Sequence, residues 1–293
     1  MQPCSNPQHN IFNPQHNIFK TRHTISIHLL CFMAATFSNA AYAIKTSDWS
    51  ISDELNQTQI NHQTWQEILD KNLIDEDASR VNLFKYGSIS GTDKKKLNQY
   101  IKAVADINPR EYPKAQQKAY WINLYNALTV QLILTNYPVE SITKLGESIF
   151  SFGPWDDEAI TISDETLSLN DIEHKIIRPF FKDKRIHYAV NCASYSCPNL
   201  SGTAYTAENT EDLLSQGACD YINHPRGVTF EGNDLLLSSI YKWYIEDFGG
   251  NTESVINHLL DCAQPNLKRK LVKFLNSPGD VDYSYDWRLN KTN

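Results

Sequence analysis

Hydrophobic residues recur at helical spacing along most of this chain. The apolar positions within 65–73 and within 97–104 lie three or four residues apart, which predicts two amphipathic helices, the second starting at Thr92 and Asp93. A helix is predicted from Pro113 to about Asn136, before Pro138, and within it the segment from Ala119 to Val130 is apolar nearly all round. A helix without a polar face is buried, so this segment is predicted to be the central helix of the core.

Short stretches rich in β-branched residues predict strands between further helices. Two hairpins are expected, with turns at 163–165 and 231–234, and a strand is expected at 186–190. Further helices are predicted at 171–177, ended by Arg178 and Pro179, at 206–223, at 239–248 and twice more before the end of the chain. Strands and helices do not alternate regularly. This predicts an α+β fold, a helix-rich single domain around the long buried helix with short antiparallel strands.

The N-terminal residues have the pattern of an export signal. Lys20 and Arg22 precede an apolar run from Ile25 to Phe37, and small residues follow. A basic start, a short apolar stretch and an A-x-A exit are typical of a signal peptide, with cleavage expected after Ala40 or Ala43. The run is far shorter than the ~20 residues that cross a bilayer. Residues 1–43 are therefore predicted to be an N-terminal extension and signal peptide, and the protein to be periplasmic or extracellular with no stable membrane span after cleavage.

Composition narrows the choice of partner. The net charge is −7 and 41% of the residues are hydrophobic, which indicates a folded core rather than a disordered chain. An acidic protein repels nucleic acid, so no nucleic-acid partner is predicted. We expect an unidentified small molecule or peptide as the ligand.

Four cysteines remain after the predicted cleavage, namely Cys192, Cys197, Cys219 and Cys262. In an oxidising compartment they allow three disulfide pairings, among which the sequence does not choose. Cys192 with Cys197 is the local option. The same two residues form Cys-x₄-Cys, a spacing wider than the commonest spacings of zinc ligands. The sequence also contains no phosphate-binding or dinucleotide-binding glycine motif. We therefore predict no metal and no cofactor.

The cysteine loop also offers a thiol nucleophile. His187 precedes Cys192 by five residues, and a catalytic cysteine needs a base nearby. If 186–190 is a strand, His187 and Cys192 face opposite sides. A bend after Val190 would then be needed to bring Cys192 round, or Cys197 would have to fold back toward His187.

Two asparagines interrupt the apolar central helix. Asn123 and Asn126 are three residues apart and so lie on roughly the same side. A buried amide without a partner costs about 1–3 kcal/mol, so both need hydrogen bonds. They either bind neighbouring backbone or line a cleft as ligand contacts.

Several longer motifs point to one family. They are Tyr-Trp-Ile-Asn-Leu-Tyr-Asn-Ala at 120–127, Ser-Leu-Asn-Asp-Ile-Glu-His at 168–174, His-Tyr-Ala-Val-Asn-Cys-Ala-Ser-Tyr-Ser-Cys-Pro at 187–198, Tyr-Lys-Trp-Tyr-Ile-Glu-Asp-Phe at 241–248 and Tyr-Asp-Trp-Arg-Leu-Asn at 285–290. In this order they resemble the domain of unknown function 547 family. The resemblance implies a domain over 113–293, after a helical lead-in at 44–112, and brings no settled activity.

The resemblance also groups the candidate residues around one cleft near 186–198. A weaker layout resemblance, to papain-like and transglutaminase-like thiol enzymes, places Tyr120 and Trp121 where a nucleophilic Cys-Trp pair would be expected. One hypothesis is a thiol-dependent hydrolase or transferase using Cys192 or Cys197 with His187. The alternative is a non-catalytic binding or scaffold domain in which Cys192 and Cys197 form a structural disulfide. The candidate ligand contacts are Asn123, Asn126, Glu173, His174, Asn191, Trp243 and Asp247.

Overall fold

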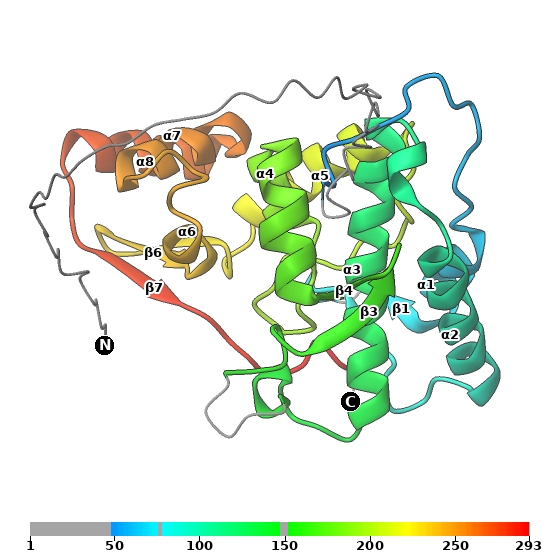
Figure 1. Cartoon of the computed structure of the whole chain (residues 1–293). Coiled ribbons are helices and arrows are strands. Elements are labelled where there is room, and N and C mark those ends of the chain that lie inside the picture. Colours follow the sequence, from blue (N-terminus) through cyan, green and yellow to red (C-terminus); the bar gives the residue numbers. More distant parts are fainter. Residues whose placement is uncertain (1–47, 76–77, 147–151, 293) are drawn as a thin grey trace, which may run out of the picture. The chain divides into compact units, whose positions relative to one another are not determined.

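The computed structural model describes residues 48–75, 78–146 and 152–292, which all belong to one compact unit, Ala43–Asn293. Helices dominate it, and the strands are short (Figure 1). Its elements in chain order are α1 (Gln63–Asn72), β1 (Leu73–Ile74), β2 (Leu83–Phe84), α2 (Gly91–Ala105), η1 (Pro109–Glu111), α3 (Lys114–Asn136), η2 (Ile142–Lys144), β3 (Glu158–Ile162), β4 (Glu165–Ser168), η3 (Asp171–Ile177), α4 (Arg178–Phe181), η4 (Lys184–Tyr188), α5 (Thr210–Ile222), β5 (Val228–Glu231), β6 (Asp234–Ser238), α6 (Ile240–Trp243), α7 (Thr252–Cys262), α8 (Pro265–Asn276) and β7 (Val281–Ser284).

The long helix α3 is the centre of the fold. Every residue from Gln117 to Val130 is buried. Helix α2 packs directly against α3 and α1 packs against α2, while the η3–α4 segment lies along another side of α3 (Figure 1). The predicted buried central helix, the two amphipathic helices before it and the α+β class are confirmed.

A second core gathers the C-terminal elements. Buried side chains of α5, α7 and α8 pack with those of β5 and β6, separately from the core around α3. Strand β5 pairs antiparallel with β6 through the predicted turn at 231–234. Strand β6 pairs parallel with β7, which departs from the antiparallel expectation because the helices α7 and α8 separate the two strands.

The predicted strand at 186–190 is wrong. Residues Lys184–Tyr188 form the 3-10 helix η4 instead. The Asp183 carboxylate accepts a hydrogen bond from the backbone N–H of Arg185, which starts a helical turn where an extended chain was expected. The face alternation of a strand therefore does not separate His187 from Cys192.

Two helix boundaries also differ from the prediction. Residues Asp171–Ile177 form a π-helix that does not stop at Pro179 but continues as α4 to Phe181. Proline is tolerated there because it falls in the first turn of α4, where no backbone N–H is needed. Helix α6 is shorter than predicted, since it ends at Trp243 and leaves Asp247 in the turns that follow.

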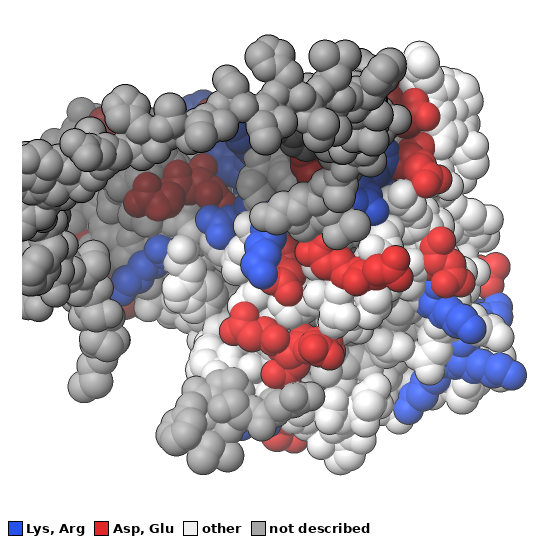
Figure 2. Space-filling view, viewed as in Figure 1, with Lys and Arg blue, Asp and Glu red and all other residues white. Residues whose placement is uncertain are grey.

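Charged side chains of both signs are spread over the surface. Acidic side chains form an interrupted band across the face drawn in Figure 2, with basic side chains beside it. Among the described residues, no helix is both long enough and apolar enough to cross a membrane.

Burial of His62 makes the stability depend on pH. His62 is 6% exposed, hydrogen-bonds Tyr100 through Nδ1, and burial lowers its pKa to about 4. Protonation therefore favours the unfolded chain, and the stability that His62 contributes above pH ~6.5 is lost as the pH falls toward 4. At pH 5 we expect a loss of about 2 kcal/mol from this group. Urea unfolding at pH 7.5 and pH 5 should show a smaller pH-dependent drop in His62→Gln than in the unaltered protein, and equal drops would contradict the assignment.

Candidate functional site

One cavity collects most of the chemically interesting residues. Its volume is about 270 Å³, and it opens between the cysteine loop, the π-helix η3, the start of α6 and the C-terminal segment. Its walls are largely aromatic. The lining residues are Tyr125, Phe152, Trp155, Asn170, Glu173, His187, Val190, Cys192, Cys197, Pro198, Ile240, Trp243, Tyr244, Tyr285 and Trp287.

The two loop cysteines are free thiols in contact with each other. Their sulfur atoms are 3.0 Å apart, and the backbone N–H of Cys192 donates to Cys197 Sγ at 3.0 Å. The hydroxyls of Ser194 and Tyr285 lie 3.0 Å and 3.2 Å from Cys192 Sγ. Cys192 is thus surrounded by three groups that can donate a hydrogen bond to a thiolate.

These contacts separate the acidities of the two thiols. Burial raises the pKa of Cys192, but the hydrogen bonds from Cys197, Ser194 and Tyr285 outweigh burial and bring the pKa below its ordinary value. Burial and the neighbouring Cys192 raise the pKa of Cys197 well above its ordinary value. Cys192 therefore loses its proton first, and a thiolate is the nucleophilic form of cysteine.

The backbone of the cysteine loop is held in an unusual conformation. Ala193 has φ 58°, in the left-handed region that costs a residue with a side chain about 1–2 kcal/mol. The Asn191 side chain accepts a hydrogen bond from the Ala193 N–H and donates one to the Pro198 carbonyl. These bonds close the loop on itself and fix the direction of Cys192.

The C-terminal segment clamps the same loop from outside. Backbone N–H groups of Tyr195 and Ser196 donate to the carbonyls of Arg288 and Asp286, and the N–H of Asn290 donates to the Ala193 carbonyl. The clamp brings Tyr285 and Trp287 into the cavity wall.

Two acidic side chains lie beside the ring nitrogens of His187. Its Nε2 atom lies 2.7 Å from Asp247 Oδ2, and Arg178 binds both oxygens of Asp247 at 2.7 Å and 3.0 Å. The hydrogen bond from His187 lowers the pKa of Asp247, and the contact with Arg178 adds to this against the effect of burial. An ionised carboxylate only accepts hydrogen bonds, so Nε2 of His187 carries the proton and Nδ1 has the free lone pair.

The other acid is Glu173, which projects from the π-helix. It is 4% exposed, and its Oε1 atom is 3.8 Å from His187 Nδ1, beyond hydrogen-bond distance. Neither atom has a hydrogen-bond partner among the described residues. The Tyr244 ring stacks on His187 with centroids 3.9 Å apart. π-Helical turns are frequent at functional sites, and here one places a buried carboxylate beside a histidine.

The expected pairing of His187 with a cysteine is not formed in this arrangement. Both ring nitrogens of His187 face carboxylates, although His187, Cys192 and Cys197 line the same cavity. A substrate bound between them would contact both the thiol and the histidine.

Four predicted ligand contacts lie elsewhere. Asn123 makes a double hydrogen bond with the backbone of Tyr205, at 2.7 Å and 2.9 Å, and Asn126 binds the Ala189 carbonyl and the Asn191 N–H at 2.9 Å and 2.8 Å. The Asn191 side chain makes its hydrogen bonds within the cysteine loop, and His174 hydrogen-bonds Arg178. None of the four lines the cavity. Glu173 and Trp243 do line it, whereas Asp247 does not line it and hydrogen-bonds His187 instead.

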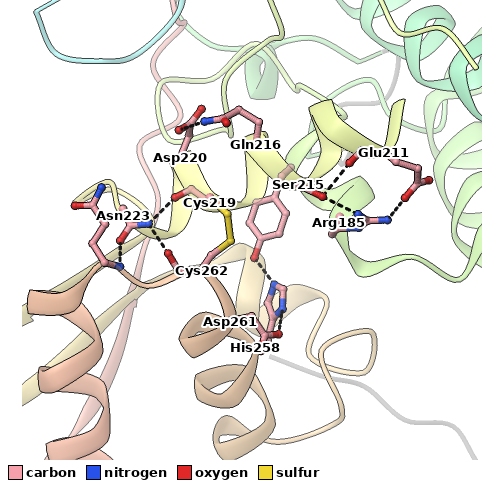
Figure 3. The surroundings of a disulfide bond; sticks show 12 residues. Arg185, Glu211, Ser215, Gln216, Cys219, Asp220, Asn223, His258, Asp261 and Cys262 are labelled. Carbon is pink, nitrogen blue, oxygen red and sulfur yellow. Dashed lines mark hydrogen bonds and ion pairs between the residues drawn. A yellow bond between two sulfur atoms is a disulfide. The ribbon is translucent and has the colours of Figure 1, made fainter. Parts of the chain in front are cut away.

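The disulfide in the described part of the chain joins Cys219 on α5 to Cys262 at the end of α7 (Figure 3). This disulfide leaves Cys192 and Cys197 as the remaining pair, and these two are not bonded to each other in this structure. Asn223 donates to the carbonyls of both bonded cysteines, at 2.8 Å and 2.9 Å. The disulfide links helices α5 and α7 of the second core and does not involve the two cavity cysteines.

Comparison with known proteins places the site in a family. Residues 109–222 match the family described as "Protein of unknown function, DUF547". This segment belongs to the DUF547 family. No curated protein matches the chain, and no solved structure matches it. The papain-like and transglutaminase-like layout thus stays a prediction.

The DUF547 segment does not contain the whole site. It carries Glu173, His187 and both cavity cysteines, but the match ends before the motifs at 241–248 and 285–290. Asp247, Trp243 and Tyr285 therefore come from outside the matched residues. Within the described parts of the DUF547 segment and its flanks, no three His, Cys, Asp or Glu side chains gather as a metal site would require.

Sequence reasoning did not assign several residues of the site, among them Tyr244, Tyr285, Trp287, Arg178 and Trp155. Arg178 follows the Glu173-His174 motif at the spacing of one helical turn, which is a usable signal for a partner of the same site. Trp155 lies in the loop before β3, and nothing in its local sequence marks it as part of a cavity wall.

Proposed function

We propose that this protein is an exported thiol-dependent hydrolase or transferase that acts on a small molecule or peptide in the described cavity. The observation that carries the proposal is a cysteine, Cys192, with three hydrogen-bond donors at its sulfur, lining the same cavity as a His187–Asp247 pair. Nucleophile, base and orienting acid are the three roles that covalent catalysis requires.

The proposed reaction is acyl transfer. As the Cys192 thiolate forms, the thiol proton passes to Nδ1 of His187. The thiolate attacks a carbonyl carbon and forms a carbon–sulfur bond, the bond from that carbon to the leaving group breaks, and the leaving group departs with the proton from His187. Water or an amine then attacks the thioester, His187 accepts its proton, and the thiolate is restored. Asp247 is a positioning residue, because it holds the Nε2–H of His187 and leaves Nδ1 as the atom that exchanges the proton.

Two features support export. Residues 20–43 have the basic start, the apolar stretch and the small-residue exit of a signal peptide. The Cys219–Cys262 disulfide suits an oxidising compartment. Fractionation of cells that make the full chain should place a shortened, disulfide-bonded form outside the cytoplasm. Recovery of an unprocessed, fully reduced form would contradict export.

The reactivity of Cys192 tests the thiol chemistry. We expect the rate of alkylation by iodoacetamide to level off at a pH below the ordinary cysteine value of 9.0, because the thiolate forms early. Cys197→Ala should move this plateau to higher pH, since it removes one donor to the sulfur. Peptide mapping identifies the labelled residue, with labelling of Cys192 before Cys197 expected.

The alternative is a non-catalytic binding domain. It is favoured by one observation, that neither ring nitrogen of His187 faces a sulfur in this structure. In this alternative Cys192 and Cys197 form a structural disulfide, so neither would be alkylated until a reductant is added. That result, together with no burst of p-nitrophenol from p-nitrophenyl acetate, would decide for it.

A further inference from the structure

The cavity contains a buried carboxylate without a strong basic partner. The contacts of Glu173 with basic side chains are long, 3.8 Å to His187 and 4.0 Å to His174. The nearby guanidinium of Arg178 is bound by both oxygens of Asp247. Among the described lining residues there is no lysine or arginine. Ionisation of a buried carboxyl group is costly unless a cation compensates it, so a positively charged guest would be stabilised in this cavity.

Aromatic rings surround the same space. Trp243, Tyr285 and Trp287 are packed together, with centroids 4.8 Å, 5.5 Å and 4.5 Å apart, and Trp155 extends the wall with its centroid 5.7 Å from Trp287. The faces of such rings carry negative electrostatic potential and attract organic cations, most strongly when water is excluded. Trp243 remains 48% exposed, so part of this surface is open to a ligand.

A metal ion does not suit this arrangement. Across the described residues no group of three metal-ligating side chains occurs, and ring faces offer no lone pairs to a hard cation. An alkylated ammonium group needs no ligand set. It needs apolar and aromatic surface together with one compensating negative charge, and the cavity offers both.

We propose that the cavity selects ligands carrying an organic ammonium group, which the aromatic wall of Trp155, Trp243, Tyr285 and Trp287 encloses and Glu173 compensates. That the substrate carries an ammonium group rests on the proposed function. That the cavity binds such a group does not, because Glu173 and the aromatic rings are separate from the nucleophile.

Matched isosteres test the charge preference. Choline and 3,3-dimethylbutan-1-ol have nearly the same shape, and only choline is charged. We expect calorimetric titration of the Cys192→Ser protein, at constant ionic strength, to show choline binding about tenfold more tightly than the alcohol. Using this variant removes the nucleophile, so loss of ester turnover and loss of cation preference are measured independently.

Variants locate the preference. Glu173→Gln in the Cys192→Ser background should abolish the difference between the two isosteres and leave the affinity for the alcohol unchanged, whereas the exposed Glu231→Gln should keep it. Trp243→Leu should weaken choline binding several-fold and Trp243→Phe should restore most of it. Because Trp243 is half-exposed, these two variants are informative even if Glu173→Gln fails to fold. Equal affinity for both isosteres, no binding of either, or a preference unaffected by Glu173→Gln and Trp243→Leu would overturn the proposal.

Discussion

Replacing Asn126 with alanine is expected to lower the free energy of unfolding by about 4 kcal/mol. The Asn126 side chain is 2% exposed and satisfies two buried backbone groups, the Ala189 carbonyl and the Asn191 N–H. Each buried group left without a partner costs about 1–3 kcal/mol. Urea unfolding followed by tryptophan fluorescence and by circular dichroism measures the change.

The same helix provides the matched control. Asn136 is exposed near the end of α3 and bonds only the Leu132 carbonyl of its own helix. Asn136→Ala should change the stability by less than about 1 kcal/mol. Equal effects of the two substitutions would show that Asn126 does not support the loop. We also expect Asn126→Ala to slow alkylation of Cys192, because the backbone that directs the thiol loses its anchor.

Replacing Cys192 with serine is expected to reduce turnover of p-nitrophenyl acetate by a factor of about 10³ or more. A serine at this position has no low-pKa thiol, and no side chain at the site is placed to activate its hydroxyl directly. Asp247→Asn should cost about 10²–10⁴ in kcat, because an amide can hold His187 with the wrong nitrogen protonated. Steady-state kinetics with burst measurement separates acylation from release of the acyl group.

Cys197→Ser is the comparison for the nucleophile. It removes the neighbouring sulfur but keeps a hydroxyl donor, so turnover should persist and its pH profile should change little. If Cys197→Ser abolishes turnover and Cys192→Ser does not, the roles of the two thiols are reversed. If both variants retain full turnover, the ester is hydrolysed elsewhere and the thiol mechanism is wrong.

The central helix was predictable because its signal is local. The segment from Ala119 to Val130 is apolar nearly all round, and such a segment, with Pro113 before it and Pro138 after it, forms a buried helix whatever surrounds it. The segment 186–190 has only five residues, too few to separate a strand from a helical turn. Its conformation is fixed by Asp183 at its start and by Asn126, about sixty residues away in sequence.

The site was predictable in its location and less so in its contacts. Sequence motifs pointed to Glu173, His187, Cys192 and Trp243, and the structure gathers all four at one cavity. They could not show that His187 faces two carboxylates, because Asp247 reaches it from a turn that was expected to be helix. The amides of Asn123 and Asn126 could not be assigned either, since their partners Tyr205 and Ala189 are distant in sequence.

The clamp of the C-terminal segment on the cysteine loop has a consequence for biosynthesis. Ser194 bridges to Leu289, and the Phe84 N–H donates to the Asn290 carbonyl, so residues from three distant parts of the chain meet there. A ribosome must therefore translate about ninety residues beyond Cys192 and Cys197 before Tyr285 and Trp287 can close the wall. A nascent chain that stops before these residues would carry the thiols without the enclosure around them. On this view, the thiols are made well before the cavity that surrounds them is complete.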